Sequence, residues 1–190
     1  SGTNEDGSPR FALERAPTRA EAVTILVRLL GAEEAAQAQT WTTPFTDVPD
    51  WAQSYVGYAY AKGYTTGVEP TRFGSSTPVS TAQFLTLLLR ALGYEDGKDF
   101  TWSTPWTLTD QLGITDGDYT AQTATFLRAD AAVVSANALY APKKGEDKTL
   151  LQDLPSIPLW CDNVAAVSAQ NVKNVQFDYT NMPTYNTITK

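Results

Sequence analysis

Arg19 and Arg128 each stand at the first position of a predicted helix, where a basic side chain favours the binding of an anion. The N–H groups of a first helical turn have no partners within the helix, and a cation there is disfavoured by roughly 0.3–1 kcal/mol. A guanidinium beside such amides can donate to the same anion oxygens. A solvated surface arginine, or one paired with a nearby carboxylate, would explain the two residues equally well.

Tryptophan is frequent for a chain of 190 residues, with five copies. Aromatic faces stack on sugar rings, and Trp51 and Trp106 are the better candidates for such a contact. The alternative is that the tryptophans anchor loops on the core as repeat-equivalent pairs, Trp41 with Trp102 and Trp51 with Trp160. The residue types leave both interpretations open.

Other chemistry is disfavoured by composition. Histidine is absent and Cys161 is the only cysteine, which removes His-based catalysis, Cys–His pairs and most zinc sites. No spacing brings two carboxylates across a cleft or completes a calcium loop. A net charge of −7 disfavours binding to nucleic acid and to anionic lipid surfaces. A membrane span needs about 18 consecutive apolar residues, and no stretch of the sequence approaches that length. We expect no enzyme activity, no cofactor, no metal site, no nucleic-acid partner and no membrane insertion.

The elements that position the arginines recur along the chain. Residues 18–33 and 80–95 match at a constant offset of 62, with seven of sixteen positions identical. Residues 127–132 are a third copy of the start of this piece. A second element, Gly63 to Gly67, recurs as Gly113 to Gly117. The chain therefore alternates two short pieces, one of which occurs three times.

Both pieces have the features of helices. Thr18 with Glu21, and Ser80 with Gln83, form capping boxes, and apolar residues follow at helical spacing. Gly31 stands where a helix ends. The second piece runs from an N-cap at Asp50 to Gly63, and its shorter counterpart runs from about 107 to 112. Without a clear strand pattern, residues 11–141 are predicted to be mainly α.

These elements together resemble the S-layer homology (SLH) family. The most diagnostic piece is residues 18–21, which looks like the family's Thr-Arg-Ala-Glu box. Residues 80–83 are a degenerate copy, and residues 127–130 are a closer copy that keeps the arginine. The segment between boxes also matches, through Phe45, Asp47, Val48, Trp51, Ala52, Tyr55, Val56, Ala59, Gly63, Gly67 and Phe73.

The resemblance implies a pseudo-threefold bundle of tandem SLH-type helical repeats. It also implies non-covalent anchoring of a secreted protein to a Gram-positive-type cell wall, through an anionic, often pyruvylated, secondary cell-wall polysaccharide or a peptidoglycan-linked glycan. The box arginine is the family's usual anion contact. Gly67 and Gly117 either let a loop approach a ligand or only supply a positive φ. The predicted glycan-binding residues are Arg19, Arg128, Trp51, Trp106, Gly67 and Gly117.

The chain departs from the family pattern at several points. The first copy lacks the Phe-x-Asp-Val half, and the second box has Thr81 in place of arginine. We therefore keep a rival function, a protein–protein interaction or adhesion module that has lost glycan binding.

The repeats suggest the following organisation. Residues 1–10 are a disordered N-terminal segment and 142–153 a linker, on either side of an SLH-like repeat domain at 11–141. That domain consists of a partial repeat (11–44), a full repeat (45–100) and a divergent repeat (101–141). The tail, 154–190, has no certain structure from its sequence, but residues 154–161 can be aligned with 45–52 and so could complete the first repeat. We expect an extracellular module of a larger multidomain surface protein.

Overall fold

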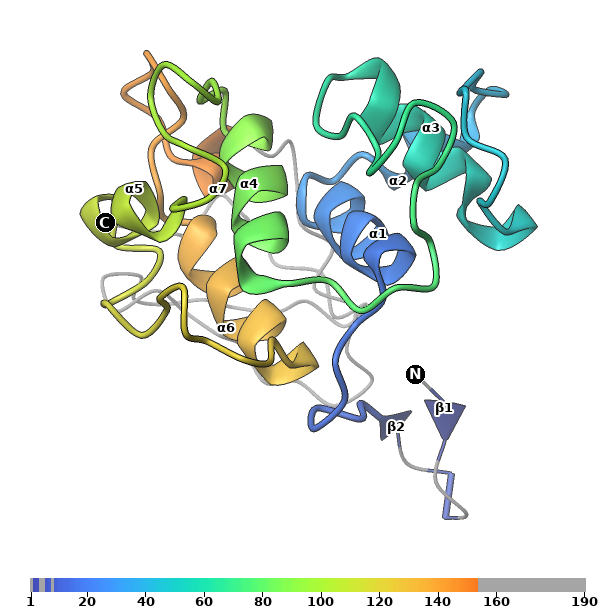
Figure 1. Ribbon diagram of the computed structural model, residues 1–190, viewed down its shortest axis with the longest axis horizontal. Coiled ribbons are helices and arrows are strands. Elements are labelled where there is room, and N and C mark those ends of the chain that lie inside the picture. Colours follow the sequence, from blue (N-terminus) through green and yellow to red (C-terminus); the bar gives the residue numbers. More distant parts are fainter. Residues whose placement is uncertain (1, 4–5, 8, 154–190) are drawn as a thin grey trace, which may run out of the picture. The chain divides into compact units, whose positions relative to one another are not determined.

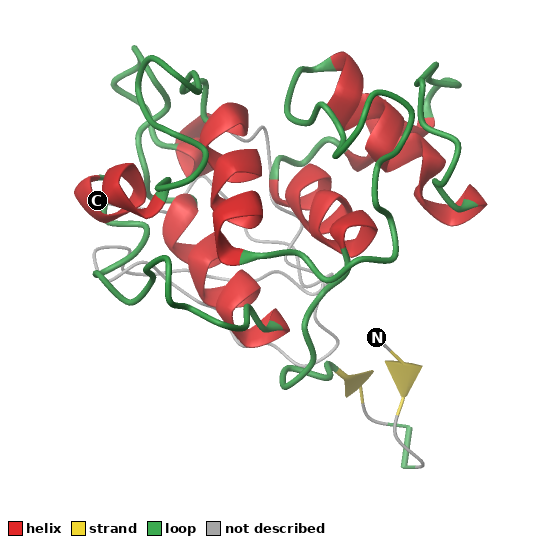
Figure 2. Cartoon of the chain, in the orientation of Figure 1, coloured by secondary structure: helices red, strands yellow, loops and turns green. Residues whose placement is uncertain are grey.

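Helices dominate the part of the chain that the computed structural model describes, which is residues 2–3, 6–7 and 9–153 (Figure 2). The predicted mainly α class is confirmed there. The chain divides into two units, Ser1–Pro155 and Ser156–Lys190. The tail from residue 154 lies outside the described residues, so its proposed completion of the first repeat stays a prediction.

The predicted helices are present in the predicted order, together with short helices at residues 33–37 and 150–153 that the sequence does not predict. They are α1 (Arg19–Leu29), α2 (Glu33–Gln37), the 3₁₀ helix η1 (Asp50–Ala52), α3 (Gln53–Ala61), α4 (Thr81–Ala91), α5 (Trp106–Gln111), α6 (Arg128–Ala138) and α7 (Leu150–Asp153). Within these described ranges, no helix has the length and apolarity that crossing a membrane requires.

Helix α1 is the centre of the core. It contacts α2, α3, α4, α6 and η1, and Figure 1 shows it between α3 and α4. Its side chains Val23, Leu26 and Val27 are fully buried, as the helical spacing of its apolar residues predicts. The same spacing on α4 buries Leu85 and Leu88.

The predicted helix starts are confirmed by their hydrogen bonds. At α1, the Glu21 N–H donates to Thr18 Oγ1 (3.3 Å) and the Thr18 N–H donates to Glu21 Oε2 (2.8 Å). Ser80 and Gln83 make the same reciprocal pair at α4. Helix α6 keeps only half of this arrangement, in which the Leu127 N–H donates to Asp130 Oδ2 (2.7 Å), because leucine has no side-chain acceptor.

The predicted helix ends at Gly63 and Gly113 are also confirmed, whereas the predicted N-cap at Asp50 is wrong. Helices α3 and α5 end just before Gly63 and Gly113, which have φ of 76° and 69°. Asp50 is not an N-cap; it begins η1, and its Oδ1 accepts from Gln53 Nε2 (3.1 Å). The Pro49–Asp50–Trp51 sequence thus favours a tight 3₁₀ turn ahead of α3.

Two segments at the borders of the domain have more structure than their composition indicates. Within residues 1–10, strand β1 (Gly2–Thr3) pairs antiparallel with β2 (Pro9–Arg10). Within 142–153, which the sequence predicts as a linker, α7 buries Leu150, whose N–H donates to Ala141 O (3.2 Å). Part of that segment therefore packs on the helical core.

The loops before α1 and α4 have the same turn. The Thr77 N–H donates to Gly74 O and the Arg15 N–H donates to Ala12 O, both at 3.1 Å. Gly74 has a φ of 79°, and Ala12, its counterpart at the repeat offset of 62, has a φ of 47°. Alanine in this left-handed region is disfavoured by roughly 1–2 kcal/mol, because Cβ approaches the following carbonyl oxygen.

We expect Ala12→Gly to raise the free energy of unfolding by about 1 kcal/mol, because glycine has no Cβ to strain. Ala132→Gly is the matched control: Ala132 is exposed within α6, where glycine should lower stability by roughly 0.5–1 kcal/mol. Urea denaturation followed by circular dichroism measures both. Equal destabilisation by the two substitutions would contradict the assigned backbone conformation.

Candidate anion-binding site

Arg19 lies at the first position of α1 and is held by the loop that precedes α4. Its backbone N–H donates to Thr77 O and its Nε to Phe73 O, both at 2.9 Å. The guanidinium carbon lies 5.0 Å from the centre of the Phe73 ring. The residue is only 5% exposed, so the solvated-arginine interpretation is wrong for Arg19.

The charge of Arg19 is only partly compensated by the protein. Burial lowers its pKa, and the nearby Asp47 carboxylate acts in the opposite direction. A guanidinium nonetheless stays protonated at neutral pH. Among the described residues, its two terminal nitrogens have no hydrogen-bond acceptor. The side chain therefore keeps two donor groups for an anion at the start of α1.

Arg128 repeats this arrangement on α6. Its backbone N–H donates to Arg15 O and its Nε to Phe11 O, both at 2.9 Å. Its Nη1 lies 3.7 Å from Glu21 Oε1, a carboxylate that Arg15 also contacts at 2.6 Å. The ion-pair interpretation thus applies in part to Arg128. An anion arriving here would compete with Glu21 for the guanidinium.

The middle box has no such arrangement. Thr81 occupies the corresponding position on α4 and is buried, and its hydroxyl has no partner among the described residues. The structure therefore agrees with the sequence that two boxes, not three, present an arginine. The pseudo-threefold relation of the three box helices is not established by these contacts and stays a prediction.

Asp47 holds the loop that positions Arg19. Its carboxylate accepts from the N–H groups of Phe73 (2.7 Å), Gly74 (2.7 Å) and Ser75 (3.2 Å). Burial opposes ionisation, but these donors outweigh it and lower the pKa of Asp47. Sequence reasoning matched Asp47 to the family but missed this role; its place in the Phe-x-Asp-Val segment was the available signal.

The tryptophans differ in how much of each side chain is exposed to solvent. Trp51 is 55% exposed on η1, which leaves its ring accessible, and Trp106 is half-buried at the start of α5. Trp41 packs edge-on against Tyr58, whereas Trp102 is 63% exposed. Trp41 is thus a core anchor as predicted, and the same expectation for Trp102 is wrong.

The two predicted glycines both have positive φ, 81° for Gly67 and 78° for Gly117. A Cβ at Gly67 would lie 2.5 Å from a ring carbon of Phe45, so close packing requires glycine there. A Cβ at Gly117 would have no atom of another described residue within 4 Å, apart from its chain neighbours, and the Gly117 N–H donates to Asp110 Oδ1 (2.9 Å). Packing against Phe45 therefore explains the glycine at position 67 without any ligand.

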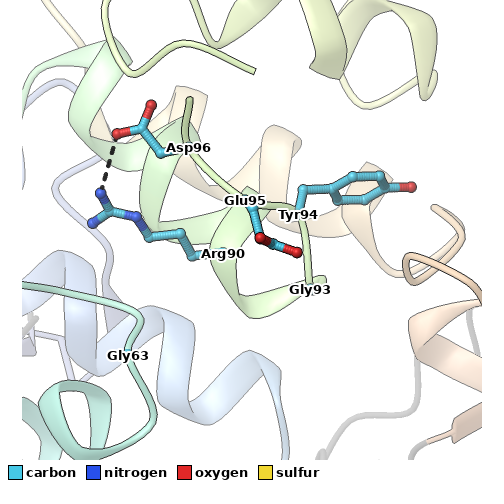
Figure 3. A pocket seen from close by; sticks show the side chains of 6 residues that line it. All are labelled: Gly63, Arg90, Gly93, Tyr94, Glu95 and Asp96. Carbon is cyan, nitrogen blue, oxygen red and sulfur yellow. Dashed lines mark hydrogen bonds and ion pairs between the residues drawn. The ribbon is translucent and has the colours of Figure 1, made fainter. Parts of the chain in front are cut away.

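A shallow open depression of about 380 Å³ lies at the far end of α4 from Thr81 (Figure 3). It is lined by Gly63, Arg90, Gly93, Tyr94, Glu95 and Asp96. Arg90 pairs with Asp96 there at 3.5 Å. None of the predicted glycan contacts lines it. Nowhere in the described ranges do three or more His, Cys, Asp or Glu side chains gather as a metal site would require.

Comparison with known proteins relates the chain to surface proteins of Gram-positive bacteria. It is 34% identical to a cell surface protein of Thermoanaerobacter kivui over 74% of this chain and 18% of that protein. It is 33% identical to a surface layer protein of Brevibacillus choshinensis over 50% of this chain and 9% of that protein. It is 35% identical to cell surface glycoprotein 1 of Acetivibrio thermocellus over 50% of this chain and 4% of that protein.

The chain therefore spans less than a fifth of the length of each of these relatives. No family model matches it. The similarities fit a surface protein of SLH type and support a location at the bacterial cell surface, in the cell wall or S-layer, as the sequence predicts.

We expect Asp47→Ala to lower the free energy of unfolding at pH 7 by about 2 kcal/mol, because three loop N–H groups lose a charged acceptor. Asp50→Ala is the matched control, because Gln53 is the one described side chain that bonds its carboxylate; this substitution should change the free energy of unfolding by less than about 0.5 kcal/mol. Urea denaturation measures both, and equal effects would contradict the role of Asp47.

The effect of Asp47→Ala should also depend on pH. Because folding lowers the pKa of Asp47, its stabilisation is complete above the unfolded value of about 3.9 and is lost as the pH falls through the folded value. The difference between the parent chain and Asp47→Ala should therefore shrink below about pH 4.

Proposed function

We propose that this domain anchors a larger secreted protein non-covalently to the bacterial cell wall by binding an anionic secondary cell-wall polysaccharide. The observation that supports it most directly is Arg19, a nearly buried guanidinium at the start of α1 with two terminal nitrogens unpaired by the described residues. A carboxylate on a sugar is the kind of anion that such a fork binds through two parallel hydrogen bonds.

The buried setting of Arg19 favours strong anion binding. Its Nε bond to Phe73 O and its contact with the Phe73 ring fix the guanidinium before any ligand arrives. A preorganised side chain loses little conformational entropy on binding. Water is largely excluded from the stem, so the charge is screened less than on an open surface.

Arg128 would provide a second, weaker contact. It has the same Nε anchor, but Glu21 already lies 3.7 Å from its Nη1. An anionic sugar would have to displace that carboxylate or share the guanidinium with it. The proposal therefore ranks Arg19 above Arg128 in affinity, which the sequence alone did not.

Trp51 supports a carbohydrate ligand because its ring is exposed on η1, close in sequence to Asp47. Large exposed aromatic side chains are the residues on which sugars stack. The proposed role is binding without catalysis, and an assay of peptidoglycan turnover by the purified domain would contradict it if bond cleavage were found.

We expect Arg19→Ala to weaken binding to purified wall polymer by about ten- to a hundredfold, through the loss of charge-assisted hydrogen bonds. Arg128→Ala should weaken it less. Arg72→Ala is the matched control, because Arg72 is an exposed arginine whose one ion-pair partner within the described part of the chain is Glu69, at 3.6 Å. Calorimetry at two salt concentrations makes the measurement, at a temperature where circular dichroism shows every variant folded.

That thermal check is needed because Arg19 is buried. Truncation of a solvated surface arginine would leave the melting temperature almost unchanged. Arg19 bonds Phe73 O and covers its ring, so its removal should lower the stability of the domain. Arg19→Lys keeps the charge but not the fork, and should restore only part of the affinity. Val27→Ala, a core truncation on the same helix, separates lost stability from lost binding.

Sacculi with and without their secondary polymer distinguish the two functions under consideration. If the domain is retained by intact sacculi but not by sacculi stripped of secondary polymer, glycan anchoring is supported. If the double variant Arg19→Ala, Arg128→Ala binds the polymer as the parent does, the arginine site is wrong and the protein-interaction function becomes the better account.

A further inference from the structure

The loop at residues 11–15 has the backbone of the loop at 73–77. Phe11 O accepts from an arginine Nε of a box helix, as Phe73 O does. Leu13 O and Arg15 O accept from the first backbone N–H groups of α6, as Ser75 O and Thr77 O do for α1. Ala12 and Gly74 supply the same left-handed residue. Every pair is separated by the repeat offset of 62.

In the loop at 73–77, a side chain of this chain accepts hydrogen bonds from the backbone amides. The N–H groups of Phe73, Gly74 and Ser75 converge on the Asp47 carboxylate. Two residues earlier in the chain, Phe45 packs on Phe73 with 5.6 Å between ring centres, and Phe73 is fully buried. An aromatic-x-aspartate segment therefore fills both the amide cradle and the apolar space beside it.

In the loop at 11–15, no described residue takes that place. The N–H groups of Phe11, Ala12 and Leu13 have no acceptor among the residues that the structure describes. Phe11 is 61% exposed and Leu13 is also exposed, whereas their counterparts Phe73 and Ser75 are buried. Three successive amides without a described acceptor and an exposed aromatic ring thus coincide at one loop.

The local charge favours a carboxylate in this cradle. Arg128 stands beside the loop as Arg19 stands beside the Asp47 carboxylate. Its contact with Glu21 is long, at 3.7 Å, and Glu21 is already bonded by Arg15. The guanidinium is therefore able to stabilise a second anion near the amides of residues 11–13.

We propose that the loop at 11–15 is a docking surface for an extended segment of a partner protein, in which an aromatic residue is followed two positions later by aspartate. The aspartate accepts from the three loop amides, and the aromatic ring covers Phe11. The inference does not depend on glycan binding at Arg19, because its contacts are the loop amides, Phe11 and the Arg128 guanidinium. A peptide and a glycan would compete only at Arg128.

A synthetic peptide with the sequence of residues 45–49 is the direct probe, added to the full chain labelled with ¹⁵N. We expect the amide signals of Phe11, Ala12 and Leu13 to shift with saturation, while those of Phe73, Gly74 and Ser75 stay in place. Peptides with Asp47→Asn or Phe45→Ala should each bind at least about tenfold more weakly. Because these changes are in the peptide, they cannot disturb the folding of the protein.

Two substitutions in the loop complete the test. Ala12→Pro fixes φ near −65°, which is incompatible with the cradle, and should abolish binding. Ala12→Gly keeps the left-handed backbone and should preserve it. Failure of the parent peptide to shift these signals overturns the proposal. Slow hydrogen exchange of the Ala12 and Leu13 amides in the full chain without peptide also overturns it, since the cradle would then be filled by this chain. The segment that the repeat alignment offers for this place, residues 154–156, is Leu-Pro-Ser and has neither the aromatic ring nor the carboxylate that the cradle favours.

Discussion

The N–H groups at the start of a box helix need acceptors, and in this domain a loop from another repeat supplies them. Arg19 N donates to Thr77 O (2.9 Å) and Ala20 N donates to Ser75 O (3.2 Å), because the first turn of α1 has no partners within its own helix. This contact sets the distance between α1 and the loop before α4. Arg19 then completes it with an Nε bond to Phe73 O, so the position of the guanidinium follows from the backbone.

The same constraint joins the ends of the repeat region. Arg128 Nε donates to Phe11 O across 117 positions of sequence, and the first N–H groups of α6 donate to the loop before α1. The loop before α4 is itself held by Asp47. A site built on such mutually bonded loops is fixed before a ligand arrives, which suits binding better than a mobile surface arginine would.

Local signals in the sequence predicted the helices well. Capping pairs such as Thr18 with Glu21, and stop glycines such as Gly63, act within a few residues and are readable directly. The burial of Arg19, the exposure of Trp102 and the left-handed Ala12 depend on which loop lies beside which helix. That depends on contacts between distant residues, so repeat equivalence alone could not provide it: Trp41 and Trp102 match in sequence, yet only Trp41 packs on the core.

The most direct test of the central claim observes the Arg19 guanidinium itself. Nitrogen-detected NMR of the labelled full chain, titrated with a charged disaccharide fragment of the wall polysaccharide, resolves individual arginine side chains. We expect the Arg19 signals to shift and to exchange more slowly with water at saturation. The Arg128 signals should respond at higher concentration, and those of the exposed Arg72 should stay unchanged. Shifts confined to other residues, with Arg19 unaffected, would contradict it.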